Sequence, residues 1–308
     1  MSYNTAVKKL TEQWKKVYKS NNPLKSLEEI DGQYPSMIRE EMEQPSFLLP
    51  EPFYGPLESD MTNDLLVLLM NPGEVKEQDK YAPTINSSTI ERYTKWNRTD
   101  FLDECGRLDK KWINIGKNSC NDGCILHNHS IDGCRWRRQR YREAKFDMGL
   151  DIDLLNTMEY IPYHTKKFND LDKDIQKWML EANTTKMAFD AVREIAENHL
   201  VKYIVSLGSA WINILEAHGY QPVEDKTVRS AENAVLGRLK KYQISENALP
   251  IVIHLVPKAV RFPTRPSVVN EMRRMLGESP LTVFNRNNVQ SDDIVIDNLK
   301  EELCLSEF

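Results

Sequence analysis

Residues 65–70 form an unbroken run of apolar side chains, "LLVLLM", which stops at Asn71, Pro72 and Gly73. An all-apolar run of this length is typical of a strand that is buried on both faces, as in a parallel sheet. A second strand is expected around residues 153–157, and further apolar runs follow in "YIVSL" and "LPIVIHLV", with helical patterns between the strands. Strands that alternate with helices predict an α/β fold. We expect a three-layer α/β/α arrangement around a central, mostly parallel, four-stranded sheet.

The spacing of apolar residues predicts a helix before the first strand and another between the second and third strands. Residues 4–20 place Leu10, Trp14 and Val17 on one face, and in residues 184–200 the face that holds Ala188 also holds His199. We expect an N-terminal helical and loop extension over residues 1–50 and an α/β domain over residues 51–280. That domain contains a Cys/His insertion at about residues 105–140, and an acidic tail follows over residues 281–308.

Charge and cysteine content restrict the compartment and the partners. The net charge is −5, and the last nineteen residues hold six carboxylates against one lysine, so the rest of the chain is close to neutral. Local basic clusters then stand out, including an arginine-rich run at residues 135–142. The five cysteines, the lack of an apolar leader and the lack of a membrane-spanning run predict a cytoplasmic protein with no membrane partner. We also expect a monomer.

Polar residues gather where the predicted strands end. In an open α/β sheet, ligands bind beyond the carboxyl ends of the strands. Those positions hold two amides, two histidines and a tyrosine: Asn71, Asn156, Tyr163, His164 and His254. The sequence contains no Walker lysine motif, GxSxG, GxGxxG or HExxH. The remaining set suits a site that holds a water, reads a planar polar edge and stabilises a developing anion.

Four segments in order resemble the uracil-DNA glycosylase superfamily. "LLMNPGE" is similar to the first active-site motif in the Asn-Pro-Gly form of its mismatch-specific members. "DLLNTMEYIPYH" resembles the strand that carries a base-reading Asn, and "YIVSLGSAW" resembles the next strand and its turn. "IVIHLVPKAVRFPTRPS" resembles the second active-site motif and the loop that enters the DNA minor groove. The resemblance covers roughly residues 50–280.

The resemblance implies a DNA glycosylase that hydrolyses the N-glycosidic bond of a flipped uracil or modified pyrimidine, in repair or in defence against modified phage DNA. Asn71 would orient a water and His254 would hydrogen-bond O2 of the leaving base. Asn156 would pair with the Watson–Crick edge of the base. The other base-binding residues would be Gly73, Tyr81, Tyr163 and His164, and the DNA-binding residues would be Lys166, Lys167, Lys258, Arg261, Phe262 and Arg265.

The chain departs from the family pattern in its second motif. Leu255 and Val256 follow His254, and proline comes only at Pro257. This change leaves open a non-catalytic DNA-binding or protein-binding member of the fold, and a hydrolase of small N-glycosides. The wedge that fills the gap left by a flipped base would be Val260, Arg261 or Phe262. Asn-Pro-Gly after a strand is also common turn chemistry.

A Cys/His cluster lies within the insertion. The segment "SCNDGCILHNHSIDGC" offers Cys120, Cys124, His127 and Cys134 as a set for structural zinc. An iron–sulfur cluster would need Cys105 as a fourth thiolate, and a polar insertion with incidental cysteines is the alternative. The proposed chemistry itself requires no cofactor.

Overall fold

A computed structural model describes residues 5–36, 50, 52–55, 57, 61–71, 136, 139–163, 168, 171–255, 260–282 and 284. The helices are α1 (Thr5–Lys19), α2 (Pro23–Asp31), α8 (Lys173–Glu181), α9 (Asn183–Glu197), α10 (Ala210–Ala217) and α11 (Pro266–Met275), with a π-helical turn at Glu143–Asp147. The strands are β1 (Phe53–Tyr54), β2 (Met61–Leu69), β3 (Leu155–Glu159), β4 (Val201–Leu207), β5 (Pro222–Arg229), β6 (Val235–Tyr242) and β7 (Ile251–Leu255).

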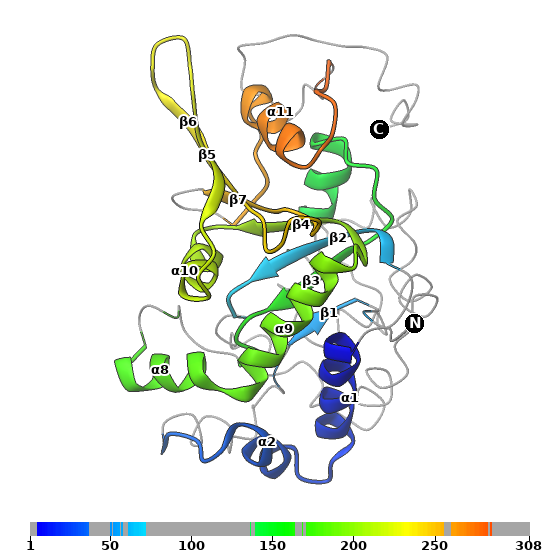
Figure 1. The fold of residues 1–308 in the computed structure, drawn as a ribbon, viewed down its shortest axis with the longest axis vertical. Coiled ribbons are helices and arrows are strands. Elements are labelled where there is room, and N and C mark those ends of the chain that lie inside the picture. The colour runs from blue at the N-terminus through cyan, green and yellow to red at the C-terminus, as the bar shows by residue number, and fades with distance from the viewer. Residues whose placement is uncertain are drawn as a thin grey trace.

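These strands form one sheet in the order β1-β3-β2-β4-β7-β6-β5 (Figure 1). The four predicted strands make up its centre, β3-β2-β4-β7, where every neighbouring pair is parallel. The expected α/β class is therefore confirmed. The sheet has seven strands rather than the expected four, because β1, β5 and β6 add antiparallel pairs at its two sides.

The direction of chain progress reverses inside the parallel centre. From β2 the chain passes to β3 on one side and then returns to β4 on the other side. In doubly wound sheets, this reversal opens a crevice at the carboxyl ends of the two strands that flank it. Here those ends are Leu69, which closes β2, and Leu207, which closes β4.

The N-terminal helices belong to the same hydrophobic core as the sheet. Leu10, Trp14 and Val17 are buried in that core, as the apolar spacing of α1 predicts. The backbone N–H groups of Ala6 and Val7 donate to the Glu194 carboxylate on α9. Residues from α1 therefore share the hydrophobic core of the sheet and bond to α9.

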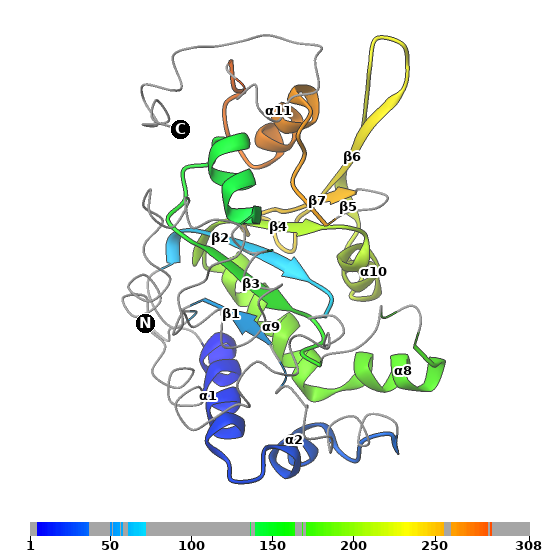
Figure 2. The same ribbon diagram turned by 180° about the vertical axis from the view of Figure 1, so that it is seen from behind.

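Helix α9 covers one face of the sheet. It lies in front of β2 and β3 in Figure 1 and behind them in the reverse view of Figure 2. Its N-terminus is capped from outside, because Oδ1 of Asp31 accepts a hydrogen bond from the Thr184 N–H at 2.8 Å. The helix ends at Glu197, so the exposed His199, with φ 53°, does not share the face that the sequence assigned to it.

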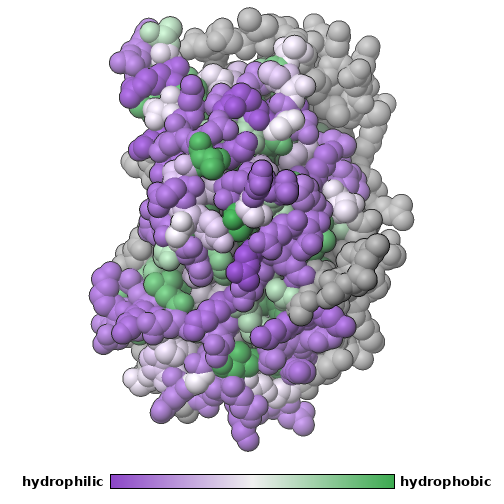
Figure 3. Space-filling model, in the orientation of Figure 1, coloured by the Kyte–Doolittle hydropathy of each residue, from purple (hydrophilic) through white to green (hydrophobic). Residues whose placement is uncertain are grey.

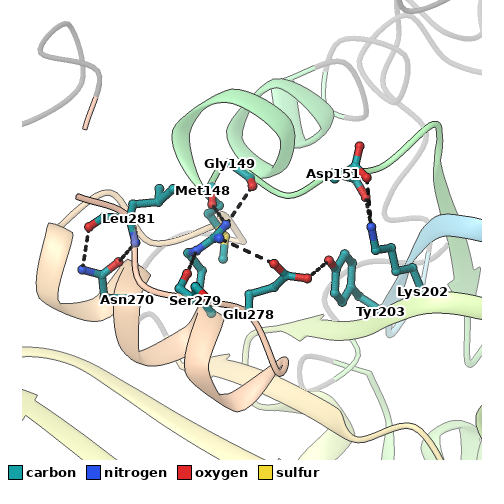
Figure 4. A network of polar contacts seen from close by, with 10 residues as sticks. Met148, Gly149, Asp151, Lys202, Tyr203, Asn270, Glu278, Ser279 and Leu281 are labelled. Atoms are coloured by element: carbon teal, nitrogen blue, oxygen red, sulfur yellow. Dashed lines mark hydrogen bonds and ion pairs between the residues drawn. The ribbon is translucent and has the colours of Figure 1, made fainter. Parts of the chain in front are cut away.

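A polar network fixes the C-terminal end of α11 against β4 (Figure 4). The Arg273 guanidinium donates to the carbonyl oxygens of Met148, Gly149 and Ser279. Glu278 lies 3.6 Å from the same guanidinium and accepts from the Tyr203 hydroxyl. Because Arg273 is buried, these bonds satisfy a charge that would otherwise be costly to desolvate.

The face covered by α1, α9 and α10 is mostly hydrophilic, with small, separate hydrophobic patches (Figure 3). Among the described residues, none of the helices has the length and apolarity needed to cross a membrane.

Candidate functional site

Asn71 lies where the sequence places it, two residues beyond the end of β2. Its side chain is partly exposed. The neighbouring backbone is fixed from two sides, because Trp211 Nε1 donates to the Leu69 carbonyl oxygen at 2.9 Å and the Ile161 N–H donates to Met70 at 2.8 Å. The first turn of α10 and the segment after β3 therefore hold Asn71 beside the crevice between β2 and β4.

A cavity of about 630 Å³ lies beyond the end of β7. Its wall includes His254 and Ser209, the residue that precedes α10. The cationic side chains on this wall are Arg238, Lys240, Arg261 and Arg265, and the described lining contains no carboxylate. Asn71 is not part of this wall. Trp211 links the cavity wall to the end of β2. It lies two residues after Ser209 of the wall, and its indole N–H bonds to the Leu69 carbonyl oxygen.

His254 is a buried, neutral imidazole. Desolvation lowers its pKa to about 4, outweighing the hydrogen bond to Arg261, which raises it. Nδ1 lies 3.0 Å from the Arg261 carbonyl oxygen, which can only accept, so Nδ1 carries the proton. Nε2 then holds a lone pair and acts as an acceptor. The donor role toward O2 of a base, which the resemblance implied, does not fit this tautomer.

The loop after β7 is held through its backbone. Nη1 of Arg140 donates to the Val260 carbonyl oxygen, and Oε2 of Glu143 accepts from the Phe262 N–H at 3.1 Å. Arg140 and Glu143 are both buried and pair with each other at 2.6 Å. Together with the His254 bond to Arg261, three consecutive residues of the loop are therefore fixed.

This arrangement separates the three wedge candidates. Phe262 is fully buried, so it cannot project from the loop. Val260 is 43% exposed, and Arg261 is also exposed. Arg140, from the arginine-rich run at residues 135–142, is buried.

Asn156 lies away from the carboxyl edge of the sheet. It is the second residue of β3 and pairs in register with Leu66, five residues before Asn71, which is roughly 16 Å along the strands. Its Nδ2 donates to Asp64 Oδ2 at 3.0 Å, and both side chains are buried. A Cβ at Gly55 would lie 1.8 Å from Asn156 Oδ1, so no space for a base exists there. The prediction that Asn156 lies at the strand end is wrong, because register could not be read from the sequence.

Tyr163 is also a packing residue. It is buried, and its ring packs against Tyr34 and Trp178. Its hydroxyl donates to Asp31 and lies 3.0 Å from the Tyr34 hydroxyl. Burial raises the pKa of Tyr163 well above its usual value, with the nearby Asp31 charge as a further cause. The base-binding role that the resemblance implied for Tyr163 is not compatible with this placement.

The remaining predicted residues lie outside the described ranges: Gly73, Tyr81, Cys120, Cys124, His127, Cys134, His164, Lys166, Lys167 and Lys258. Within those ranges, no group of three or more His, Cys, Asp or Glu side chains is arranged to hold a metal ion.

Sequence reasoning missed Arg238 and Lys240. They lie on a hairpin, β5–β6, whose polar and partly exposed residues lack the apolar runs that marked the other strands. The alternation of the buried Gly237 and Leu239 with the charged Arg238 and Lys240 is the signal that could have found β6.

Comparisons of the chain with protein-family models, with curated proteins and with solved structures find no match.

Proposed function

We propose that this chain hydrolyses the N-glycosidic bond of a flipped uracil or modified pyrimidine in DNA, on a three-layer α/β/α core. The observation that carries the proposal is the neutral His254 in a cation-lined cavity at the carboxyl edge of the sheet. Asn71 lies at the same edge, at the crevice where the strand order reverses. This is the edge at which α/β folds bind their ligands.

The charges of this edge suit the bond that breaks. Cleavage leaves positive charge on the sugar and negative charge on the departing base, and the base must first leave the stack. The Asn71 amide does not take up a proton near neutral pH, so its carbonyl oxygen would orient a water toward the sugar rather than deprotonate it. The field of Arg238, Arg261 and Arg265 would favour the base anion.

His254 takes a different part from the one that the resemblance implied. With its proton on Nδ1, its Nε2 would accept a hydrogen bond from an N–H of the base or from a water. Stabilisation of the leaving base would then come from the cations. Because Asn156 and Tyr163 are packed in the core, base reading would fall to residues such as Tyr81 and His164.

Base release is the direct test. DNA carrying uracil, G·T or G·U mismatches, or modified and phage-type hypermodified cytosines would be incubated with the protein, and abasic sites would be detected by alkaline strand breakage. We expect cleavage at one of these bases and its loss in Asn71→Ala. Absence of abasic sites on every substrate, with a correctly folded protein, would contradict the proposal.

A second candidate is a non-catalytic DNA-binding protein of the same fold. Two observations favour it: Asn156 is buried against Asp64, and His254 has no proton on Nε2. DNA binding that weakens with salt, without base release on any substrate, would support this reading. The cationic cavity favours either DNA-directed function over hydrolysis of small uncharged N-glycosides, which would need no such charge.

A further inference from the structure

The β5–β6 hairpin brings two cations to the cavity from one side of the sheet. Arg238 pairs in register with Leu255, and Lys240 pairs with Ile253. A Cβ at Gly237 would lie 2.8 Å from Val268 of α11, so the alternate positions 238 and 240 project to the opposite face. Lys240 confirms this direction, because it lies 3.9 Å from Glu216 of α10.

The loop after β7 brings two further cations toward the same space. Arg261 and Arg265 line the cavity, and both are exposed. Arg265 is also the residue that precedes α11, and no side chain caps that helix. The uncapped N–H groups of a helix start carry partial positive charge, so they add to the field of the two arginines.

Most of this charge is not neutralised within the described part of the chain. Lys240 has Asp225 at 3.5 Å besides Glu216. Among the described residues, no carboxylate lies within ion-pair distance of Arg238, Arg261 or Arg265. Since arginine forks match the geometry of phosphate oxygens, three unpaired arginines that line one cavity indicate an anionic ligand.

The walls of the cavity are held in place before any ligand binds. Glu224 of β5 pairs with Arg274 of α11 and with Lys241 of β6 at 3.4 Å, which joins the hairpin to the helix. The absence of a side chain at Gly237 allows β6 to approach Val268 closely. At about 630 Å³, the space is within the range of sites that enclose a small molecule or one nucleotide.

We propose that the cavity binds a backbone phosphate of a nucleic-acid strand, with the β5–β6 hairpin and the 261–265 loop as its two walls. The inference rests on the proposed function for the identity of the ligand as nucleic acid. It adds the hairpin as a DNA-contacting element.

The test measures DNA affinity without any catalytic readout. Binding of labelled single- and double-stranded oligonucleotides to the full chain would be followed by fluorescence anisotropy over a range of salt concentrations. The variants are Arg238→Gln and Arg265→Gln. The matched control is Lys226→Gln, which removes an exposed cation from β5 of the same hairpin but does not line the cavity.

We expect each arginine variant to weaken binding roughly fivefold to twentyfold at low salt and to reduce the slope of log K against log salt by about one unit. Lys226→Gln should change affinity less than about twofold. Equal affinities and slopes for Arg238→Gln, Lys226→Gln and the wild type would overturn the proposal. Thermal melting of each variant would confirm that the substitutions leave the fold intact.

Replacing single phosphates by a neutral linkage identifies the bound phosphate directly. Oligonucleotides with single methylphosphonate linkages would be scanned along the strand. A methylphosphonate at one linkage should weaken binding to the wild-type protein and should not weaken binding to Arg238→Gln any further. Free inorganic phosphate is the other source of the same chemistry, and competition by phosphate at low millimolar concentration, with no sensitive linkage, would contradict a strand-bound phosphate. If these binding results held but the wild-type protein released no base, only the proposed glycosylase function would be contradicted.

Discussion

Nδ1 of His254 lies 3.0 Å from the carbonyl oxygen of Arg261, and this contact fixes which nitrogen of the imidazole carries the proton. The contact also joins strand β7 of the parallel centre to the loop that forms one wall of the cavity. The loop is fixed on either side of this contact by Arg140 and Glu143. Four predictions follow from these contacts and from the placement of Asn71 and Asn156.

The first prediction concerns stability against pH. The pKa of His254 is about 4 in the folded chain, below the ordinary value of 6.5, because burial disfavours the charged form. Between these values the unfolded chain binds more protons, so the free energy of unfolding falls as the pH is lowered from 6.5 to 4, by roughly 3 kcal/mol. His254→Gln should lack this contribution. Denaturant unfolding of both proteins at several pH values would measure this difference. Equal losses of unfolding free energy in the wild type and in His254→Gln would contradict the lowered pKa of His254.

The second prediction treats Asn156 as a structural residue. Its Nδ2 satisfies the buried Asp64 carboxylate, so Asn156→Ala should lower the free energy of unfolding by roughly 2–4 kcal/mol. Asn63→Ala, on the neighbouring strand and only partly buried, is the control and should change it by less than about 0.5 kcal/mol. Chemical denaturation distinguishes the two. A stable Asn156→Ala protein would show that the Asp64 contact is unimportant.

The third prediction concerns the pair that holds the loop. Arg140→Met leaves Glu143 buried without its partner and should cost roughly 3–5 kcal/mol. Arg142→Met changes an exposed arginine on the same helical segment and should be nearly neutral. If the two variants unfolded at the same denaturant concentration, the Arg140–Glu143 pair would not stabilise the loop.

The parallel centre of the fold could be predicted because β2, β4 and β7 contain apolar runs that need burial on both faces. Asn71 and His254 were placed correctly for the same reason, since each follows or ends such a run. The β5–β6 hairpin could not be predicted this way, because it is an exposed edge with few apolar residues. As a consequence, Arg238 and Lys240 were missed.

Asn156 and Tyr163 show a second limit of sequence reasoning. Their positions in the chain suggested the strand end, but register and packing decide where a side chain lies. The Asp64 carboxylate and Gly55 hold Asn156, and Asp31 holds Tyr163 through contacts between residues far apart in the chain. No local pattern marks such pairs.

The fourth prediction compares Asn71 with Asn156 and tests the central claim, that any base chemistry takes place at the carboxyl edge of β2. Single-turnover abasic-site formation would be measured for wild type, Asn71→Ala and Asn156→Ala, with each rate divided by the folded fraction. We expect Asn71→Ala to lose roughly 100-fold or more, since it removes the group that positions the water, and Asn156→Ala to stay near the wild-type rate per folded molecule. The reverse order, with Asn156→Ala inactive and Asn71→Ala unchanged, would contradict the account.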